Sequence, residues 1–207
     1  MSNKSKIYSI IPLIKSYLFW ILCIRPQPPN LLKELVVKKF GKQYKIKTFI
    51  ETGTFRGEMI EAVKTSFDKI FSIELDPTLY KNAKRKFSGE TNIEIFEGDS
   101  SKILPDILKK INETSLFWLD AHFSGIMCGI KTTRGEKETP ILEELITIAN
   151  HRIKNHVILI DDAVDFTGEN DYPSVKELEK FIFSHFPDHE MEIKRNIIRI
   201  YPKLGSS

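Results

Sequence analysis

The chain has 207 residues, of which 29% are charged and 41% apolar, and its formal net charge is +3. This size predicts one globular domain with a sizeable core, and the scattered charges argue against nucleic acid as a partner. Cys23 and Cys128 are the only cysteines, too few for a disulfide framework or a zinc site. We therefore expect a reducing, cytoplasmic location.

The N-terminal part differs in composition from the rest. Residues 7–24 are mostly apolar and are followed by a proline-rich linker, and we divide the chain into residues 1–29 and a domain at 30–207. No small-residue cleavage site follows, which argues against a secretory signal. Three alternatives stay open: a helix lying in a membrane interface, a marginal spanning anchor, and a helix that packs on the domain or on a second copy of the chain.

Strands and helices alternate through the domain. The first helix is predicted at 30–44, with Asn30 as its N-cap and Leu31, Leu32, Leu35, Val36 and Phe40 at helical spacing. Strands are predicted near 47–52, 69–75, 92–97, 115–120 and 156–161, with helices near 57–66, 78–87, 100–111, 139–153 and 174–185. Two last strands, near 189–194 and 197–201, form a hairpin around Arg195 and Asn196. This order predicts an α/β, Rossmann-like, doubly wound, seven-stranded, mostly parallel sheet with a C-terminal antiparallel hairpin.

A glycine turn follows the first strand. Glu51 ends that strand, and Gly53 and Gly57 stand in the turn that leads to the next helix. Such a turn lets the backbone and a helix N-terminus approach a nucleotide. A carboxylate two residues before the first glycine would repel a diphosphate but suits a ligand with a cationic end, such as S-adenosylmethionine.

Two more acidic residues follow the next strands. Glu74 stands 23 residues after Glu51, where a carboxylate can accept hydrogen bonds from both hydroxyls of a ribose. Asp99 follows the third strand, placed to accept from the amine of an adenine, and Ser100 beside it is assigned to the same site. Each residue alone is equally compatible with a turn or a helix cap.

With these residues in view, the chain resembles the class I S-adenosylmethionine-dependent methyltransferases over about residues 45–201. The resemblance implies that Glu51, Gly53 and Gly57 surround the methionine part of the cofactor. It places Glu74 on the ribose and Asp99 near the adenine. The family pattern often has a third glycine midway in the turn, where this chain has Phe55.

Three aspartates follow the fourth and fifth strands. Asp120, Asp161 and Asp162 would converge on one ion if these strands are neighbours, and carboxylates suit magnesium, calcium or manganese. Because successive strand residues point to opposite faces, sharing an ion requires the chain to turn at Asp162. The arrangement resembles the metal-dependent O-methyltransferases of the catechol and macrocin types, which implies a divalent metal, magnesium in our prediction. The alternative is that the aspartates only end strands.

His122 stands two residues after Asp120 and is our predicted catalytic base, with a hydrogen-bonding role as the alternative. We interpret the other four histidines as surface residues. Residues 121–139 form a long connection that contains Lys131, Arg134 and Lys137 and is typical of a lid or a substrate-binding segment. In the segment 139–144 we interpret the two glutamates as acids facing the helix dipole.

These observations predict an S-adenosylmethionine-dependent, divalent-metal-assisted O-methyltransferase that acts on a hydroxyl of a sugar, glycan or related small molecule. The alternatives are a metal-dependent glycosyltransferase and a non-catalytic, membrane-associated member of the fold. Peripheral contact with the inner face of a membrane and a homo-oligomer are both compatible with residues 7–24.

Overall fold

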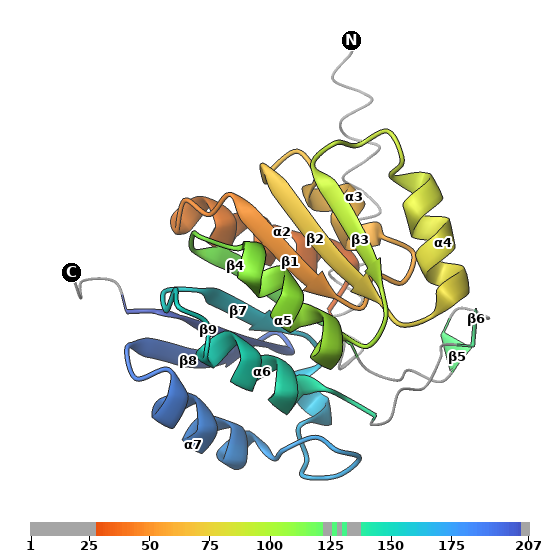
Figure 1. The fold of residues 1–207 in the computed structure, drawn as a ribbon. Helices are drawn as coiled ribbons and strands as arrows, with labels where there is room; N and C mark the ends of the chain where they lie inside the picture. The colour runs from red at the N-terminus through yellow and green to blue at the C-terminus, as the bar shows by residue number, and fades with distance from the viewer. Residues whose placement is uncertain (1–27, 122–125, 128–129, 132–137, 204–207) are drawn as a thin grey trace, which may run out of the picture.

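The computed structural model describes residues 28–121, 126–127, 130–131 and 138–203. Its centre is a seven-stranded sheet in the order β3-β2-β1-β4-β7-β9-β8 (Figure 1). Five strands are parallel, and β9 and β8 are antiparallel additions at one side. The strands are β1 (Thr48–Thr52), β2 (Lys69–Glu74), β3 (Ile93–Glu97), β4 (Ser115–Leu119), β7 (Val157–Ile160), β8 (His189–Lys194) and β9 (Ile197–Pro202). The predicted doubly wound sheet and its C-terminal hairpin are confirmed.

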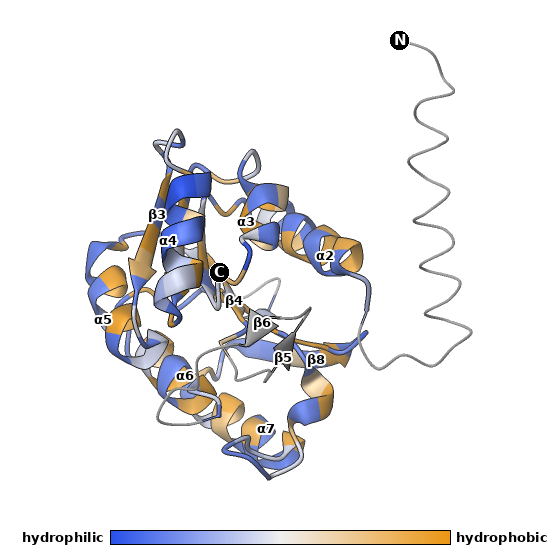
Figure 2. Cartoon of the chain, turned by 90° about the vertical axis from the view of Figure 1, so that its right-hand side faces the viewer, coloured by the Kyte–Doolittle hydropathy of each residue, from blue (hydrophilic) through white to orange (hydrophobic). Residues whose placement is uncertain are grey.

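Helices cover both faces of the sheet. One face carries α2 (Asn30–Gln43), α3 (Glu58–Val63) and α4 (Pro77–Lys86), and the other carries α5 (Ser100–Lys110), α6 (Ile141–Ala149) and α7 (Val175–His185). The turned view shows that α4 is largely hydrophilic on its outer side (Figure 2). Three short elements complete the described chain: η1 (Ala163–Asp165) and the two-residue strands β5 (Ile126–Met127) and β6 (Ile130–Lys131).

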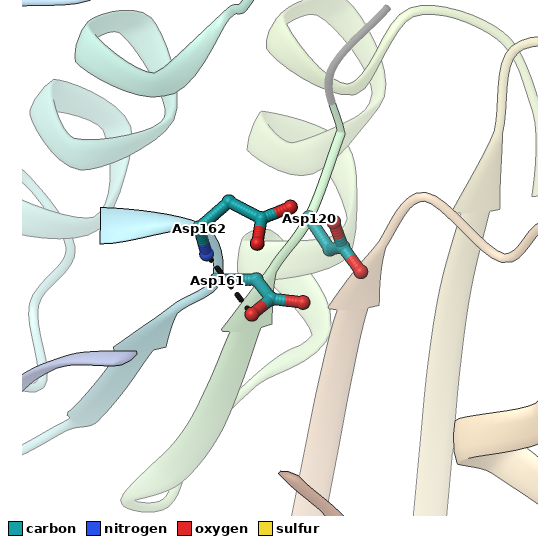
Figure 3. A group of neighbouring side chains, drawn as sticks. All are labelled: Asp120, Asp161 and Asp162. Carbon is teal, nitrogen blue, oxygen red and sulfur yellow. Dashed lines mark hydrogen bonds between the residues drawn. The ribbon is translucent and has the colours of Figure 1, made fainter. Parts of the chain in front are cut away.

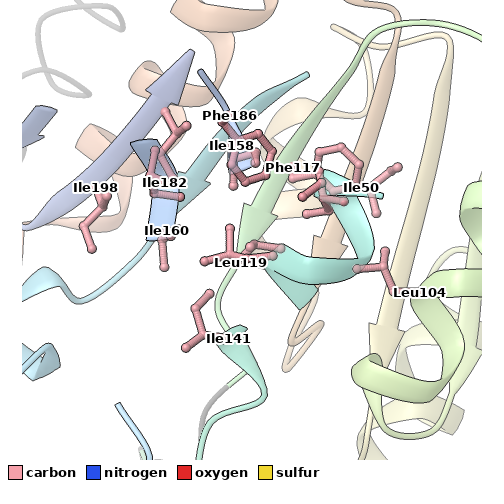
Figure 4. Close-up of a cluster of buried hydrophobic side chains, with 14 of the residues drawn as sticks. Ile50, Leu104, Phe117, Leu119, Ile141, Ile158, Ile160, Ile182, Phe186 and Ile198 are labelled. Atoms are coloured by element: carbon pink, nitrogen blue, oxygen red, sulfur yellow. The ribbon is translucent and has the colours of Figure 1, made fainter. Parts of the chain in front are cut away.

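The central strands are apolar because both of their faces are covered. All five residues of β4 are buried, and they alternate between two cores: Phe117 and Leu119 face α5 to α7, while Leu116 and Trp118 face α2 to α4. Figure 4 shows the first of these cores, where Phe117 packs among residues of both sheet and helices. Burial of this kind stabilises by roughly 1.5–3 kcal/mol for each large side chain, which explains why near-continuous apolar runs in the sequence predicted these strands.

The position of the helices locates the site. The connections from β1 to β2 and from β2 to β3 cross one face, while those from β3 to β4 and from β4 to β7 cross the other. The winding therefore reverses between the neighbouring strands β1 and β4. In open α/β sheets, ligands bind beyond the carboxyl ends of the strands at this switch point.

Two expectations about α2 are wrong. Pro29 occupies the N-cap position, whereas Asn30 is the first helical residue and donates a side-chain hydrogen bond to Glu58 at 2.9 Å. The buried face also differs, because Val37 packs in the core while Leu35 is 51% exposed. Pro29 has an extended ψ of 144° and is the last residue before the helix, so the preference of asparagine for caps does not decide where the helix begins.

The interpretation of the histidines as surface residues is wrong for three of the four. His151, His156 and His189 are buried, whereas His185 is exposed. His156 Nδ1 accepts a hydrogen bond from the backbone N–H of Ser115 at 3.0 Å. A neutral ring then carries its proton on Nε2, which lies 2.8 Å from His151 Nδ1. These rings fill the space at the amino ends of β4 and β7.

Among the described residues, none of the helices combines the length and apolar character that crossing a bilayer requires. Residues 7–24, on which the three N-terminal alternatives depend, lie outside the described residues, and the division at residue 29 stays a prediction.

Buried His156 makes a contribution to stability that is lost in mild acid. Burial, followed by the charge of His151, lowers the pKa of His156 to about 3, whereas an unfolded histidine titrates near pH 6.5. Below pH 6.5 the unfolded chain therefore binds a proton that native His156 does not, and the contribution of His156 to stability falls as the pH falls towards 3. Buried carboxyls with raised pKa values, such as Glu51, have the opposite pH dependence, so the test compares variants. We expect the change in Tm from pH 7 to pH 5 to be less destabilising in His156→Gln than in wild type. Thermal unfolding at both pH values checks this, with His185→Gln as the exposed control. Equal changes in His156→Gln and wild type would contradict it.

Candidate functional site

The backbones of β1 and β4 meet closely at Gly53. Its φ is +85°, and a Cβ built there would lie 2.5 Å from the backbone oxygen of Asp120. The Gly53 N–H donates to the carbonyl of Ile73 at 2.9 Å, which ties the turn to β2 as well. Gly57 has a φ of +66°, and a Cβ there would lie 2.6 Å from the Phe87 ring. Both predicted glycines are therefore required by conformation and by close packing.

Glu74 holds the glycine turn in shape. One of its carboxylate oxygens accepts the N–H of Phe55 at 2.6 Å, and the other accepts the N–H of Asp76 at 2.9 Å. Phe55, where the family pattern often has glycine, adopts a left-handed conformation with φ 49°. Burial raises the pKa of Glu74, and these backbone hydrogen bonds oppose the rise. The turn can thus form without the third glycine because a carboxylate supports it.

Glu51 is buried at the end of β1 and is 2% exposed. The Ser72 hydroxyl donates to it at 2.6 Å, and the Ser72 oxygen also lies 2.6 Å from the Thr54 hydroxyl. Burial raises the pKa of Glu51 to about 8, so most of this carboxyl is neutral at pH 7. A cation bound beside it would favour the ionised form, and this property suits a ligand with a positively charged end.

Asp99 and Ser100 begin α5. Asp99 is the N-cap, and its Oδ1 accepts the N–H of Ser101 at 2.9 Å and the Ser101 hydroxyl at 2.7 Å. Ser100 is buried and is the first helical residue. The ordinary role of a helix cap is therefore present, and a role of either residue towards adenine stays a prediction.

The three aspartates come together at the ends of β4 and β7 (Figure 3). One carboxylate oxygen from each lies within 4.8 Å of the other two. The required turn at Asp162 is present, because its φ of 51° and ψ of 53° are left-handed. Its N–H donates to Asp161 Oδ1 at 2.9 Å, and its own Oδ1 accepts from Asn196 at 3.0 Å.

This trio has the chemistry of a hard-cation site. A divalent ion with oxygen ligands at about 2.0–2.6 Å bridges oxygens that are up to about 5 Å apart. Burial and, after it, repulsion from the Asp120 carboxylate raise the pKa of Asp161 to about 7, while the Lys33 ammonium opposes the rise. A bound cation would relieve this repulsion. The three residues therefore fit a magnesium or manganese ion, which would be held by all three carboxylates.

The comparisons with known proteins bear on the fold. No protein-family model matches the chain, and comparison with curated proteins returns no relative. Solved structures do match. The O-methyltransferase TomG of Streptomyces achromogenes, in complex with S-adenosylmethionine, is 13% identical with a TM-score of 0.60, covering 98% of this chain and 100% of that one.

Two further structures agree with it. The S-adenosylhomocysteine-bound methyltransferase PaMTH1 of Podospora anserina is 17% identical, with a TM-score of 0.56 over 83% of this chain and 78% of that one. An O-methyltransferase of Bacillus cereus, also with S-adenosylhomocysteine, is 11% identical, with a TM-score of 0.56 over 83% and 81%. The chain has the class I methyltransferase fold.

Sequence analysis missed Lys33, a lysine that this methyltransferase fold brings to the aspartates. Its ammonium forms an ion pair with Asp161 Oδ2, and the two side chains are 13% and 1% exposed. The pattern that could have revealed it is the buried stripe of α2, because Lys33 stands three, four and seven residues before Val36, Val37 and Phe40. A lysine at the first position of such a stripe points towards the interior.

Glu144 stands in the first turn of α6, as predicted, but it is also buried, with 1% of the residue exposed, which the sequence analysis did not predict. Burial raises its pKa to about 7. It shares an apolar stripe of α6 with Ile141, Leu145 and Ile148, which was the available signal. A small pocket joins Glu144 to two of the aspartates. Its lining consists of Leu119, Asp120, Ala121, Thr139, Ile141, Glu144, Ile160, Asp161, Phe166 and Tyr172.

His122 lies outside the described residues, as do Arg134 and Lys137 of the connection at 121–139. Lys131 belongs to β6, which pairs antiparallel with β5. The predicted base and the predicted lid or substrate-binding segment therefore stay predictions.

Because the Gly53 backbone lies so close to the Asp120 backbone, a single added methyl group at residue 53 should destabilise the protein. We expect Gly53→Ala to lower the free energy of unfolding by about 2 kcal/mol or more, because the new Cβ meets backbone atoms in a left-handed conformation. Gly89→Ala is the matched control, since no atom lies within 4 Å of a Cβ at that position. Denaturant unfolding of both variants measures the difference. A stability of Gly53→Ala equal to that of Gly89→Ala would refute the contact.

Proposed function

We propose that this protein transfers the methyl group of S-adenosylmethionine to a hydroxyl oxygen of a sugar, glycan or related small molecule, with help from a divalent metal. One observation carries the proposal. The glycine turn at Gly53 and the aspartate trio share one edge of the sheet, where the Gly53 backbone contacts the Asp120 backbone. A methyl donor in the first site and an acceptor in the second would be neighbours.

The cofactor would be held by residues of three strand ends. Glu51 would face the cationic methionine end, because ionisation of its buried carboxyl is favoured only beside a positive charge. Glu74 would accept from the ribose hydroxyls while it keeps the Phe55 N–H, since each carboxylate oxygen has two lone pairs. Asp99 and Ser100 would lie near the adenine. The matching structures with bound S-adenosylmethionine or S-adenosylhomocysteine support this use of the fold.

The aspartate trio would position the acceptor. A metal held by Asp120, Asp161 and Asp162 would lower the pKa of an acceptor hydroxyl and fix its direction. The acceptor oxygen then bonds to the methyl carbon as the carbon–sulfur bond breaks, and its proton passes to a base, for which His122 is our proposal. The fold supports oxygen as the acceptor atom, because TomG and the Bacillus cereus protein are O-methyltransferases. The sugar or glycan acceptor rests on the resemblance to the macrocin type.

Cofactor binding depends on Glu74 in this proposal. We expect Glu74→Gln to weaken binding of S-adenosylhomocysteine roughly 10-fold, because hydrogen bonds to a charged group contribute about 1.5–3 kcal/mol. Glu97→Gln is the matched control, since Glu97 is the exposed residue beside Glu74 in the β2–β3 register. Isothermal titration measures both affinities. Absence of heat with wild type at millimolar ligand, or an equal loss in Glu97→Gln, would argue against this cofactor site.

Methyl transfer itself is tested with S-adenosylmethionine that carries a radioactive methyl group, incubated with a glycan extract and with purified sugars. We expect label in a carbohydrate product, loss of transfer in excess chelator and recovery with magnesium, while S-adenosylhomocysteine binds equally well throughout. Transfer that continues unchanged in chelator would remove the metal from the proposal and leave methyl transfer intact.

A further inference from the structure

The aspartate trio already contains a cation that belongs to the protein. The Lys33 ammonium forms an ion pair with Asp161 Oδ2, and Asp161 Oδ1 accepts the N–H of Asp162 at 2.9 Å. Both oxygens of this buried carboxylate therefore have partners. Asp120 and Asp162 lie close enough for their charges to act on the same ammonium.

The balance of charge keeps Lys33 in this position. Burial alone would lower the pKa of Lys33, but the carboxylates of Asp161, Asp120 and Asp162 outweigh burial and raise it. The ammonium is therefore charged at neutral pH. Lys33 is thus a cation in direct contact with one member of a group of three acidic side chains.

We propose that Lys33 is the resident counter-ion of this site and that a divalent metal binds by displacing its ammonium from Asp161. This inference rests on the metal role of the trio in the proposed function. A metal that takes Asp161 as a ligand must come within about 2.0–2.6 Å of a carboxylate oxygen. An ammonium held by the same carboxylate would then lie only a few ångströms from a doubly charged ion, and the repulsion drives the two cations apart.

The exchange requires movement of one side chain rather than of a helix. Lys33 stands in the first turn of α2, and the helix is fixed by Val36, Val37 and Phe40, which are buried in the core. The lysine side chain has a flexible stem of four carbons, so its ammonium can move away from Asp161 while the helix stays packed. The ion pair thus neutralises Asp161 before metal arrives, and it weakens metal binding because it must be broken.

The test is equilibrium binding of Mn²⁺ to full-length protein, followed by the loss of the free-ion signal in electron paramagnetic resonance. We expect Lys33→Met to bind Mn²⁺ at least roughly 10-fold more tightly than wild type, because no ion pair has to be broken. Lys33→Arg keeps the charge and should bind no more tightly than wild type. Lys39→Met, an exposed lysine of the same helix, is the control and should leave the affinity unchanged.

Thermal unfolding in chelator provides a second readout and shows that each variant is folded. Without metal, Lys33→Met should melt at a lower temperature than Lys39→Met, because the buried Asp161 carboxylate loses its ion-pair partner. The addition of Mn²⁺ should then raise its Tm by more than it raises that of wild type. Mn²⁺ affinity of Lys33→Met equal to or below that of wild type would overturn the inference.

The outcomes separate this inference from the proposed function. If wild type needs metal for transfer and Lys33→Met binds it no more tightly, the inference fails and the function stands. If wild type binds no Mn²⁺ and Lys33→Met does, the inference holds, and metal assistance fails for the natural protein. If neither binds Mn²⁺, both the inference and the metal role fail, while titration with S-adenosylhomocysteine still decides the cofactor site.

Discussion

Close contact between the backbones of β1 and β4 is the constraint on which the site depends. Gly53 leaves no room for a side chain against the Asp120 carbonyl, so the ends of the two strands meet where the winding of the sheet reverses. Because of this contact, the glycine turn with Glu51 and Glu74 lies beside the aspartate trio. Two acidic sites therefore lie next to each other at the switch point of the sheet.

Those acidic sites are costly to the folded protein. Burial raises the pKa of Glu51, Glu74, Glu144 and Asp161, and all four carboxyls stand at or near the carboxyl edge of the sheet. A protein selected for stability alone would place apolar residues there, because a buried carboxyl has to lose either its charge or its hydration. Groups with perturbed pKa values that gather at one edge are typical of a functional site. The Lys33 ion pair offsets part of the cost.

The sequence was sufficient to predict the sheet and most of the acidic residues at its carboxyl edge. Apolar runs such as Leu116 to Leu119 marked the buried strands, and the acidic residue after each strand predicted convergence, because parallel strands end at one edge. The turn at Asp162 followed from the alternation of side chains along a strand. Each of these inferences used local pattern and topology, which the structure keeps.

The remaining errors concern side chains whose environment comes from distant parts of the chain. His156 is buried because β4 supplies the Ser115 N–H, 41 residues away, and Lys33 points inward because Asp161 lies 128 residues further on. Composition predicts that histidine and lysine stay at the surface, and only a contact partner reverses this. For Lys33 and Glu144 the sequence contained one local signal, namely a charged residue within an apolar helical stripe. His122 lies outside the described residues, so the choice of base still rests on sequence.

A crystal structure with S-adenosylhomocysteine and Mn²⁺ bound together tests the central claim most directly, because anomalous scattering locates the metal independently of the protein atoms. We expect manganese within ligand distance of Asp120, Asp161 and Asp162, and the sulfur of the cofactor beside it at the Gly53 turn, with Glu74 on the ribose. Manganese bound elsewhere, or a cofactor away from the Gly53 turn, would contradict the claim that this edge of the sheet joins a methyl donor to a metal-held acceptor.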